Sequence, residues 1–373
     1  MLAIDDAPPQ AAPAADMPER VRALCRAELA PLAEAIDAGF YPAATIRRLG
    51  VLGAYRAHLP DASGRLDLAA AIAAASAVSE TCMATGFVHW CQSTLAWYLG
   101  NGDNARLRDR LLDEVASGRR LGGTGLSNPM KSFFGIERLK LEGRRVPGGY
   151  VVRGALPWVS NLGPDHAFGT VFAVADEPAR RVMFLAECDA PGVSLHPCEP
   201  FLAMDGTATY AVRFRDVFVP DANVLADPCA AYVERIRAGF VLLQTGMGIG
   251  LMRDCLAIMR EVRPALGHVN RYLTDQPEDL AEALAAIEAL VARLARTPYD
   301  PSAAYFREVV EARLRCGEGA LHFAQAALLH AGARGFVRKS RVQRRLREAA
   351  FFAIVTPATK QLRKMLADMD GQH

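Results

Sequence analysis

The chain has 373 residues, 51% of them hydrophobic, and a formal net charge of +2. This length suits two or three domains with a sizeable core, and the near-neutral charge excludes an electrostatic reason to expect nucleic acid or an anionic membrane as partner. The eight cysteines are scattered without a CxxC pair, which argues against a metal site or disulfides and favours a reduced, cytoplasmic protein.

The first part of the chain is predicted to be helical. Residues 1–17 are rich in Ala, Pro and Asp and lack a basic start followed by an apolar run, so we expect a disordered lead-in rather than a signal peptide. Residues 18–120 show helical periodicity. Pro31 predicts a kink or break, residues 68–97 form an Ala-rich helical run with few breakers, and Ser117-Gly118 is a helix stop.

Residues 121–227 have a different composition. Gly and Pro separate short runs rich in β-branched and aromatic residues, including residues 150–154, 168–174, 182–186 and 212–217. These runs predict strands of a small β-barrel or sandwich.

Long helices are predicted again in residues 228–373. Two apolar stripes lie at helical spacing, at Ile249-Met252-Leu256-Met259 and at Leu280-Leu284-Ile287-Val291-Leu294. Asp300-Pro301 predicts a helix start. The arginine-rich residues 338–347 are expected to form a solvated helix face that also meets a phosphate or a neighbouring subunit. No stretch of eighteen uncharged apolar residues occurs, so we expect no membrane span.

Common catalytic motifs are absent from the sequence. There is no GxGxxG, Walker, HExxH or GxSxG sequence, which excludes a Rossmann or P-loop interpretation. The informative segments are instead residues 41–53 (ending Leu-Gly-Val-Leu-Gly), 125–129 (Gly-Leu-Ser-Asn-Pro), 149–161 (ending Pro-Trp-Val-Ser-Asn) and 206–220 (Gly-Thr-Ala-Thr through Val-Phe-Val-Pro). In this order and spacing they resemble segments of the acyl-CoA dehydrogenase family.

The resemblance implies an α+β multidomain fold with an N-terminal helical domain, a β middle domain and a C-terminal four-helix bundle. It also implies FAD lying between the β domain and the bundle. A flavin ring needs polar groups at its pyrimidine edge and an apolar wall on one face, and the residues of these segments can provide both. Leu126 and Ser127 would contact that edge, Ser132 the pyrophosphate, Trp158 one ring face and Ser160 the N5 side. A lone Trp in a strand is otherwise more often a core residue.

Two further segments resemble the family's contacts to the adenine half of FAD. Arg263 in Arg-Pro-Ala-Leu-Gly would bind the pyrophosphate across a subunit interface, and the match requires the preceding helix to be about one turn shorter. An ordinary surface arginine is the alternative. Gly332 and Gly335 would let backbone approach the cofactor, and a plain helix C-cap is their alternative. Family members form homodimers or homotetramers.

The resemblance fails at the catalytic base. The family's glutamate, which removes the α-proton while a hydride leaves for flavin N5, would stand at Thr356, and its alternative position at Phe240. Glu234 lies six residues earlier and is not expected to replace it. The catalytic residues therefore stay unknown, and three functions remain open. They are oxidation of an acyl-CoA-like substrate with electron-transfer flavoprotein or oxygen as acceptor, oxygenation of an aromatic or CoA-bound precursor, and a non-catalytic flavin-binding scaffold. A faint oxygenase-like pattern is Ser79–Thr85 with Ser93-Thr94.

Overall fold

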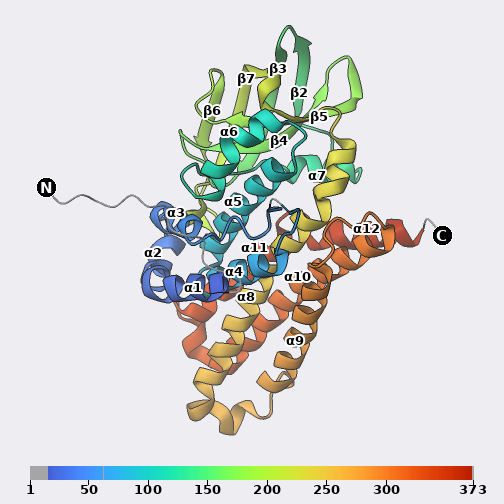
Figure 1. Ribbon diagram of the computed structural model, residues 1–373. Helices are drawn as coiled ribbons and strands as arrows, with labels where there is room; N and C mark the ends of the chain where they lie inside the picture. Colours follow the sequence, from blue (N-terminus) through green and yellow to red (C-terminus); the bar gives the residue numbers. More distant parts are fainter. Residues whose placement is uncertain (1–15, 62, 372–373) are drawn as a thin grey trace, which may run out of the picture.

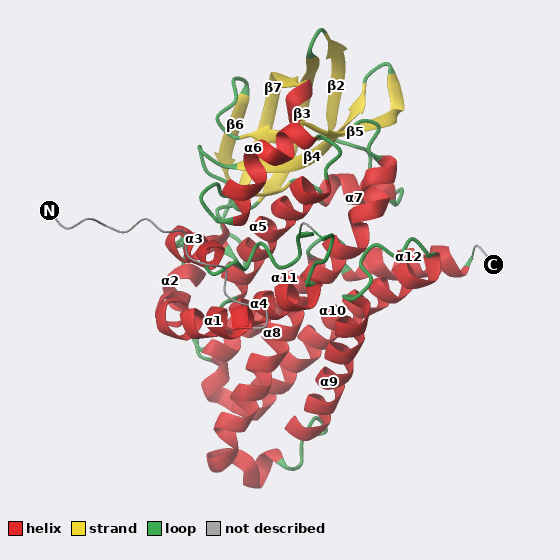
Figure 2. Cartoon of the chain, viewed as in Figure 1, coloured by secondary structure: helices red, strands yellow, loops and turns green. Residues whose placement is uncertain are grey.

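The computed structural model describes residues 16–61 and 63–371. The predicted lead-in, residues 1–17, therefore lies outside the described residues except for its last two. The order of the remaining elements is helical, then β, then helical, as the sequence predicts. Figures 1 and 2 show the strands gathered at one end of the molecule and the long helices at the other.

The N-terminal region consists of short helices followed by three longer ones. Its elements are α1 (Met17–Leu24), the π-helical turn η2 (Cys25–Leu29), the 3-10 turn η3 (Ala30–Leu32), α2 (Ala33–Asp37), α3 (Ala43–Val51), α4 (Leu68–Thr81), α5 (Met83–Asn101) and α6 (Ala105–Ala116). The change of helix type at η2 and η3 confirms the break predicted at Pro31. After α6 the chain turns at Gly118, whose φ is +74°.

The Ala-rich run is divided, contrary to its appearance in the sequence. It forms α4 and α5, which are separated by Cys82 in an extended conformation (φ −154°, ψ 115°). Asp67 caps the start of α4 by accepting a hydrogen bond from Ala70 N. At the start of α5, Met83 N donates to the buried Glu348 carboxylate from the far end of the chain. A tertiary contact thus helps to hold a break that no local breaker residue announces.

The middle region is one mixed sheet with a core of its own. Its strands are β1 (Gly122–Thr124), β2 (Leu141–Val146), β3 (Gly149–Val159), β4 (Ala167–Val174), β5 (Glu177–Glu187), β6 (Val193–Pro197), β7 (Tyr210–Pro220) and β8 (Val224–Ala226), with the short helix α7 (Ser127–Phe133) after β1. The strand order is β6-β7-β3-β2-β4-β5-β8, with β1 pairing to β4. The pairs β2–β4 and β1–β4 are parallel, and the others are antiparallel.

Side chains that alternate along the strands fill the sheet's core. Phe168, Phe172, Phe184 and Phe214 are buried there with ring centroids 5.3–6.3 Å apart. In β7, Val212 and Phe214 are buried while Arg213 and Arg215 are exposed, as the alternation predicts.

The C-terminal region is a bundle around one long helix. Its helices are α8 (Ala230–Asn270), α9 (Pro277–Leu294), α10 (Ala303–Ala331), α11 (Arg341–Ile354) and α12 (Thr359–Asp370), with the 3-10 turn η6 (Gly332–Phe336) between α10 and α11. The cap of α10 is Ser302, whose hydroxyl accepts from Tyr305 N, so the predicted start at Asp300-Pro301 is two residues early. Among the described helices, α8 alone is long and apolar enough to cross a membrane, and 89% of its most apolar window is buried inside the protein.

Ion pairs deep in the bundle tie α11 to α8 and α4. Arg345 is fully buried, and it donates to Asp254 Oδ2 at 2.5 Å, to Glu348 Oε2 at 2.7 Å and to the Ser79 carbonyl at 3.1 Å. Burial opposes the charged form, but Asp254 and Glu348 outweigh it and raise the pKa of Arg345. The prediction of a solvated arginine face is therefore wrong for Arg345, since three partners keep its charge inside the protein.

Candidate active site

A pocket of ≈420 Å³ lies where the sheet, the loop before β7 and the helices α5, α8 and α11 meet. Hydroxyl groups occupy part of its wall, and they belong to Thr124, Ser127, Ser160, Thr207, Thr209 and Thr356. Among the described residues that line it, Lys131 and Arg347 carry charge, and none has a carboxylate. The pocket is therefore a largely apolar space with neutral donors and acceptors and two cations at its wall.

Trp158 presents its indole to this pocket because β3 contains a bulge. Leu156 pairs with Val212 and Val159 pairs with Tyr210, so three steps along β3 match two along β7 and one residue is extra. Leu156 and Val159 are buried in the sheet, whereas Trp158 is 59% exposed and lines the pocket. The indole is thus outside the sheet's core, where a large aromatic side chain in a strand would ordinarily lie.

The residues after Trp158 are held by buried hydrogen bonds. Asn161 has a φ of +62°, and its amide donates to the Gly122 carbonyl at 2.5 Å, while its side-chain oxygen accepts from Tyr41 OH at 2.5 Å. Burial raises the pKa of Tyr41 well above its usual value, so this hydroxyl keeps its proton. Ser160 precedes this anchor, and its hydroxyl lies 2.6 Å from Thr209 Oγ1, which in turn lies 2.8 Å from Thr207 Oγ1. These contacts fix the hydroxyl side of the pocket.

The opposite polar edge comes from the turn between β1 and α7. Thr124 Oγ1 lies 2.7 Å from Tyr98 OH and accepts from Leu126 N at 3.3 Å. Leu126 is buried and does not line the pocket, whereas Ser127 does. Asn128 binds the Lys140 amide and the Arg138 carbonyl, so it secures the turn instead of facing the pocket.

Both positions expected for a base line the pocket, and neither carries a carboxylate. Thr356 follows α11, and its Oγ1 lies 2.9 Å from Ser127 Oγ. Phe240 belongs to α8, and its ring lies 5.2 Å from that of Trp90 at 65°. Trp90 stacks with Phe87 at 5.7 Å, and Phe87 meets Phe351 edge-on at 4.8 Å. One wall of the pocket is therefore a continuous group of four aromatic rings.

The two cations at the wall already have partners. Arg347 donates to both Asp37 carboxylate oxygens and, at 2.9 Å, to the Leu202 carbonyl. The hydrogen bond to Asp37 raises the pKa of Arg347. Lys131 Nζ lies 3.7 Å from Glu137. Arg347 thereby joins α11, α2 and the loop before β7 at one edge of the pocket.

The other predicted cofactor contacts do not line this pocket. Ser132 is on α7 but does not line it. Arg263 is exposed on α8 and pairs with Glu278 of α9 at 2.5 Å, and α8 continues seven residues past it. Gly332 ends α10 with a φ of +61°, and the buried Gly335 packs beside Ala331. The structure of one chain does not bring these residues together with Trp158.

Other residues with titratable side chains have structural surroundings. Burial lowers the pKa of His89 to about 3, and it contacts the Tyr55 ring. His166 binds the Asn161 carbonyl at 2.9 Å, and His196 is exposed beside Ser194. Cys82 and Cys91 are buried outside the pocket lining, and Glu234 is an exposed partner of Arg237. None of these residues offers a base to the pocket.

Much of the pocket wall was not predicted from the sequence. The residues concerned include Phe87, Trp90, Thr124, Lys131, Thr207, Thr209 and Phe351. Arg347 lies in the arginine-rich run 338–347, which was predicted to form a solvated face that also meets a phosphate or a neighbouring subunit. Thr207 and Thr209 stand in the segment 206–220 that carries the resemblance, so that segment offered a signal. The aromatic residues offered none, because an aromatic side chain in an apolar helix is usually core.

Comparisons with known proteins agree with this architecture. A family model described as "Acyl-CoA dehydrogenase, N-terminal domain" matches residues 14–119. The chain is 28% identical to benzylmalonyl-CoA dehydrogenase of Aromatoleum aromaticum (strain DSM 19018 / LMG 30748 / EbN1), over 91% of this chain and 92% of the relative. Over nearly its whole length, the chain is therefore similar to acyl-CoA dehydrogenases.

Solved structures of the family have the same fold. The glutaryl-coenzyme A dehydrogenase in complex with glutaryl-CoA is 19% identical and aligns with a TM-score of 0.86, over 96% of this chain and 95% of that one. Butyryl-CoA dehydrogenase from Megasphaera elsdenii is 17% identical with a TM-score of 0.83, and each chain is covered completely. The α–β–α arrangement seen here is therefore that of acyl-CoA dehydrogenases.

Proposed function

We propose that this protein is an FAD-dependent oxidoreductase that transfers a hydride from an acyl-CoA-like substrate to flavin N5 without a carboxylate base. The observation that carries the proposal is the 59% exposed Trp158, which stands on the wall of a pocket between sheet and bundle. A side chain of this size leaves water when a flat ring stacks against it, and the burial of apolar area stabilises the complex.

The residues around Trp158 suit a flavin ring. Ser160 with Thr209 on one side and Ser127 with Thr124 on the other provide hydroxyl groups for its polar edge. FAD, when bound, supplies the hydride acceptor. The protein's own groups hold the ring, orient it and exclude water through the aromatic wall.

The substrate we propose is a CoA thioester whose acyl group is apolar and ring-bearing. Phe87, Trp90, Phe240 and Phe351 form an unbroken aromatic surface on the pocket, and aromatic pairs prefer the edge-on and offset contacts that a substrate ring would extend. The similarity to benzylmalonyl-CoA dehydrogenase, a relative named for a CoA thioester that carries a benzyl group, supports this choice.

The second candidate is a flavin-dependent oxygenase. It is favoured by one observation, the lack of Asp and Glu among the described residues lining the pocket. A neutral Thr356 and an aromatic Phe240 at the base positions do not remove a weakly acidic α-proton, whereas oxygen transfer to an aromatic or CoA-bound precursor needs no such base.

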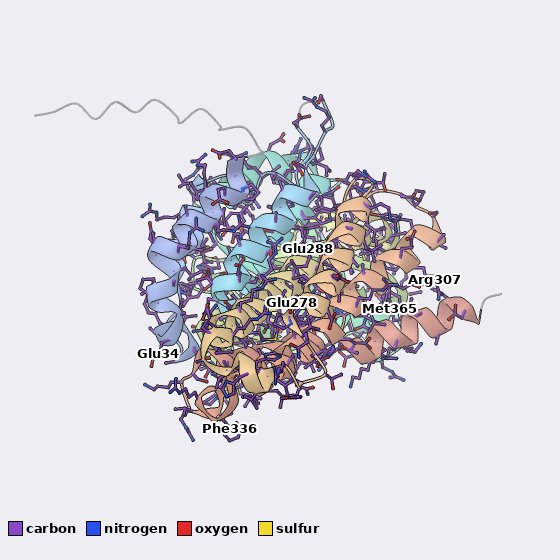
Figure 3. The ribbon with its side chains drawn as sticks, turned by 90° about the horizontal axis from the view of Figure 1, so that it is seen from below. Glu34, Glu278, Glu288, Arg307, Phe336 and Met365 are labelled. Carbon is purple, nitrogen blue, oxygen red and sulfur yellow. The ribbon has the colours of Figure 1, made fainter. Side chains whose placement is uncertain are left out.

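The proposal includes a homodimer or homotetramer. The predicted adenine-side residues Arg263, Gly332 and Gly335 lie outside the pocket lining of one chain. Phe336 and Val337, which follow Gly335, are 77% and 61% exposed, and Figure 3 shows Phe336 at the periphery of the bundle. A second copy covering this edge would bury apolar side chains there. We further propose a cytoplasmic enzyme whose electron acceptor is an electron-transfer flavoprotein or oxygen.

A spectroscopic experiment tests the proposal. Purified protein reconstituted with FAD should show flavin absorbance, and Trp158→Ala should weaken FAD binding at least about tenfold, whereas Trp158→Phe retains most of it. Under anaerobic conditions, an arylalkanoyl-CoA should bleach the flavin. Failure of the wild-type protein to bind FAD would overturn the proposal. Binding without bleaching, together with an oxygen-inserted product when reduced flavin and oxygen are supplied, would favour the oxygenase.

A further inference from the structure

A buried arginine of α10 lies behind the pocket and is not used by the proposed chemistry. Arg313 is 0% exposed, and its guanidinium lies 4.0 Å from the centre of the Phe352 ring. Within the described residues, no Asp or Glu lies within ion-pair distance of it. Burial lowers the pKa of Arg313 to about 10, so the group still carries its charge at neutral pH.

The contacts of Arg313 lead to the pocket wall through one glutamine. Its Nε donates to Gln244 Oε1 at 2.9 Å, and Gln244 Nε2 donates to the Thr356 carbonyl at 2.8 Å. An arginine has only donors, so Gln244 must turn its oxygen to Arg313 and its amide hydrogens to Thr356. The orientation of the glutamine is therefore set by the charge. Two hydrogen bonds and one amide group place the guanidinium within roughly 8 Å of the Thr356 carbonyl oxygen.

Arg313 also holds the end of the helix that leads to Thr356. Its Nη2 donates at 2.9 Å to the Phe352 carbonyl, one of the last carbonyls of α11, which lack partners within the helix. On the pocket side, Thr356 Oγ1 lies 2.9 Å from Ser127 Oγ. The segment 352–356 is thus fixed from the bundle by Arg313 and Gln244 and from the cofactor side by Ser127.

We propose that Arg313 and Gln244 are positioning residues that hold the Thr356 hydroxyl against Ser127 and that the unbalanced charge of Arg313 favours negative charge on the ligand bound in the pocket. The second part rests on the proposed function, because it is the reduced flavin or an enolate-like substrate that would carry this charge. The first part needs no cofactor.

A purely structural role fits this arrangement poorly. A cation buried without a carboxylate is costly, and an apolar side chain of similar volume would fill the same space at lower cost. Contrast Arg345, which is equally buried but is balanced by Asp254 and Glu348. The charge of Arg345 is neutralised inside the bundle, whereas that of Arg313 is left to act on the pocket.

Gln244→Glu is the decisive variant. The carboxylate keeps the acceptor for Arg313 and nearly the same shape, but it balances the charge and cannot donate to the Thr356 carbonyl. We expect bound flavin in this variant to be harder to reduce, with the ratio of reduced to oxidised flavin at a fixed potential falling at least about threefold. Thr356→Val removes the hydrogen bond to Ser127 and keeps the charge of Arg313. Its ratio of reduced to oxidised flavin should therefore stay within a factor of two of wild type, while FAD binds more weakly. Thr356→Ser should behave as wild type in both measurements.

Amide hydrogen exchange of the apoprotein tests whether Gln244 and Arg313 position the segment that contains Thr356. Gln244→Met, which removes both hydrogen bonds of the side chain, should speed amide exchange across residues 351–358, and Thr356→Ser should not. If Gln244→Glu does not fold, Arg313→Met, which removes the charge, replaces it in the potential measurement. Equal flavin potentials in wild type and Gln244→Glu would overturn the electrostatic part, and unchanged exchange in Gln244→Met would overturn the positioning part. Wild-type protein that binds no FAD would refute the proposed function while leaving the exchange result decisive.

Discussion

The close approach of α4 and α8 should make Gly250→Ala strongly destabilising. A Cβ built on Gly250 would lie 2.2 Å from the Ser76 carbonyl oxygen and 2.7 Å from Glu80 N, both of which are backbone atoms of α4. Gly246, one turn earlier on the same face, would meet the Ile72 carbonyl at 2.6 Å. A carbon and a carbonyl oxygen ordinarily stay about 3.3 Å apart, so the two helices must separate by roughly 1 Å.

The size of the effect follows from two opposing contributions. Alanine stabilises a helix interior by about 1 kcal/mol relative to glycine. Overpacking costs about 1–3 kcal/mol, and more when rigid backbone must move in place of a side chain. Because the clash here is with backbone, we set the overpacking cost at about 3–4 kcal/mol. After the gain of about 1 kcal/mol is subtracted, Gly250→Ala should lower the free energy of unfolding by about 2–3 kcal/mol. Gly267→Ala on the same helix is the matched control, since its Cβ meets only Arg263 Cγ at 3.4 Å.

Urea unfolding of the apoproteins, followed by circular dichroism, measures the difference. Gly267→Ala should be as stable as wild type or more stable by about 0.5 kcal/mol, while Gly250→Ala unfolds at clearly lower urea. The shift should also reach the pocket, because Arg345 of α11 binds the Ser79 carbonyl of α4. If Gly250→Ala matches the stability of Gly267→Ala, the tight packing of α4 on α8 is wrong.

Acid should destabilise the protein through His89, whose pKa burial lowers to about 3, because the unfolded chain binds a proton near pH 6.5 and the folded one does not. The stability contributed by the neutral ring is fully present above pH 6.5 and is lost as the pH falls towards 3. At pH 5 the free energy of unfolding should already be lower by about 2 kcal/mol. Urea unfolding between pH 5 and 8 should be less pH-dependent in His89→Leu but not in the exposed His196→Asn, and equal slopes in all three proteins would contradict this. Phe240→Ala should cost about 3–5 kcal/mol and, because loss of this ring enlarges the pocket, raise the ratio of kcat/KM for a bulky over a short acyl-CoA about tenfold. Phe172→Ala in the sheet core should cost similar stability without changing that ratio, and the same shift in both variants would remove the assigned role of Phe240.

Local patterns predicted the elements of this fold better than their ends. Changes in the density of Gly, Pro and β-branched residues separated helical from β regions, because those residues act through the backbone of their own segment. The break at Cys82 could not be predicted in this way, since Met83 N binds Glu348, 265 residues further along the chain. The burial of Arg345 has the same cause, because its carboxylate partner Asp254 lies 91 residues earlier.

The pocket shows the same limit. Ser127, Trp158 and Ser160 stand in contiguous segments with recognisable spacing, and the bulge that turns Trp158 outward is a local feature of β3. The aromatic wall is assembled from Phe87 of α5, Phe240 of α8 and Phe351 of α11. Each of these is, in its own segment, an ordinary apolar residue of a buried helix. Only packing of the three helices makes them one surface.

The distribution of charge links the carboxylate-free pocket lining to the buried arginine. A pocket lined by a glutamate supplies negative charge itself, and a nearby cation would then serve mainly to lower the pKa of that glutamate. Here the described lining has no carboxylate, while Arg313 keeps an unbalanced charge two hydrogen bonds behind Thr356. Negative charge in this pocket must therefore come from what binds there. A ligand that becomes anionic on reaction is stabilised by the field of Arg313, and one that stays neutral gains nothing from it.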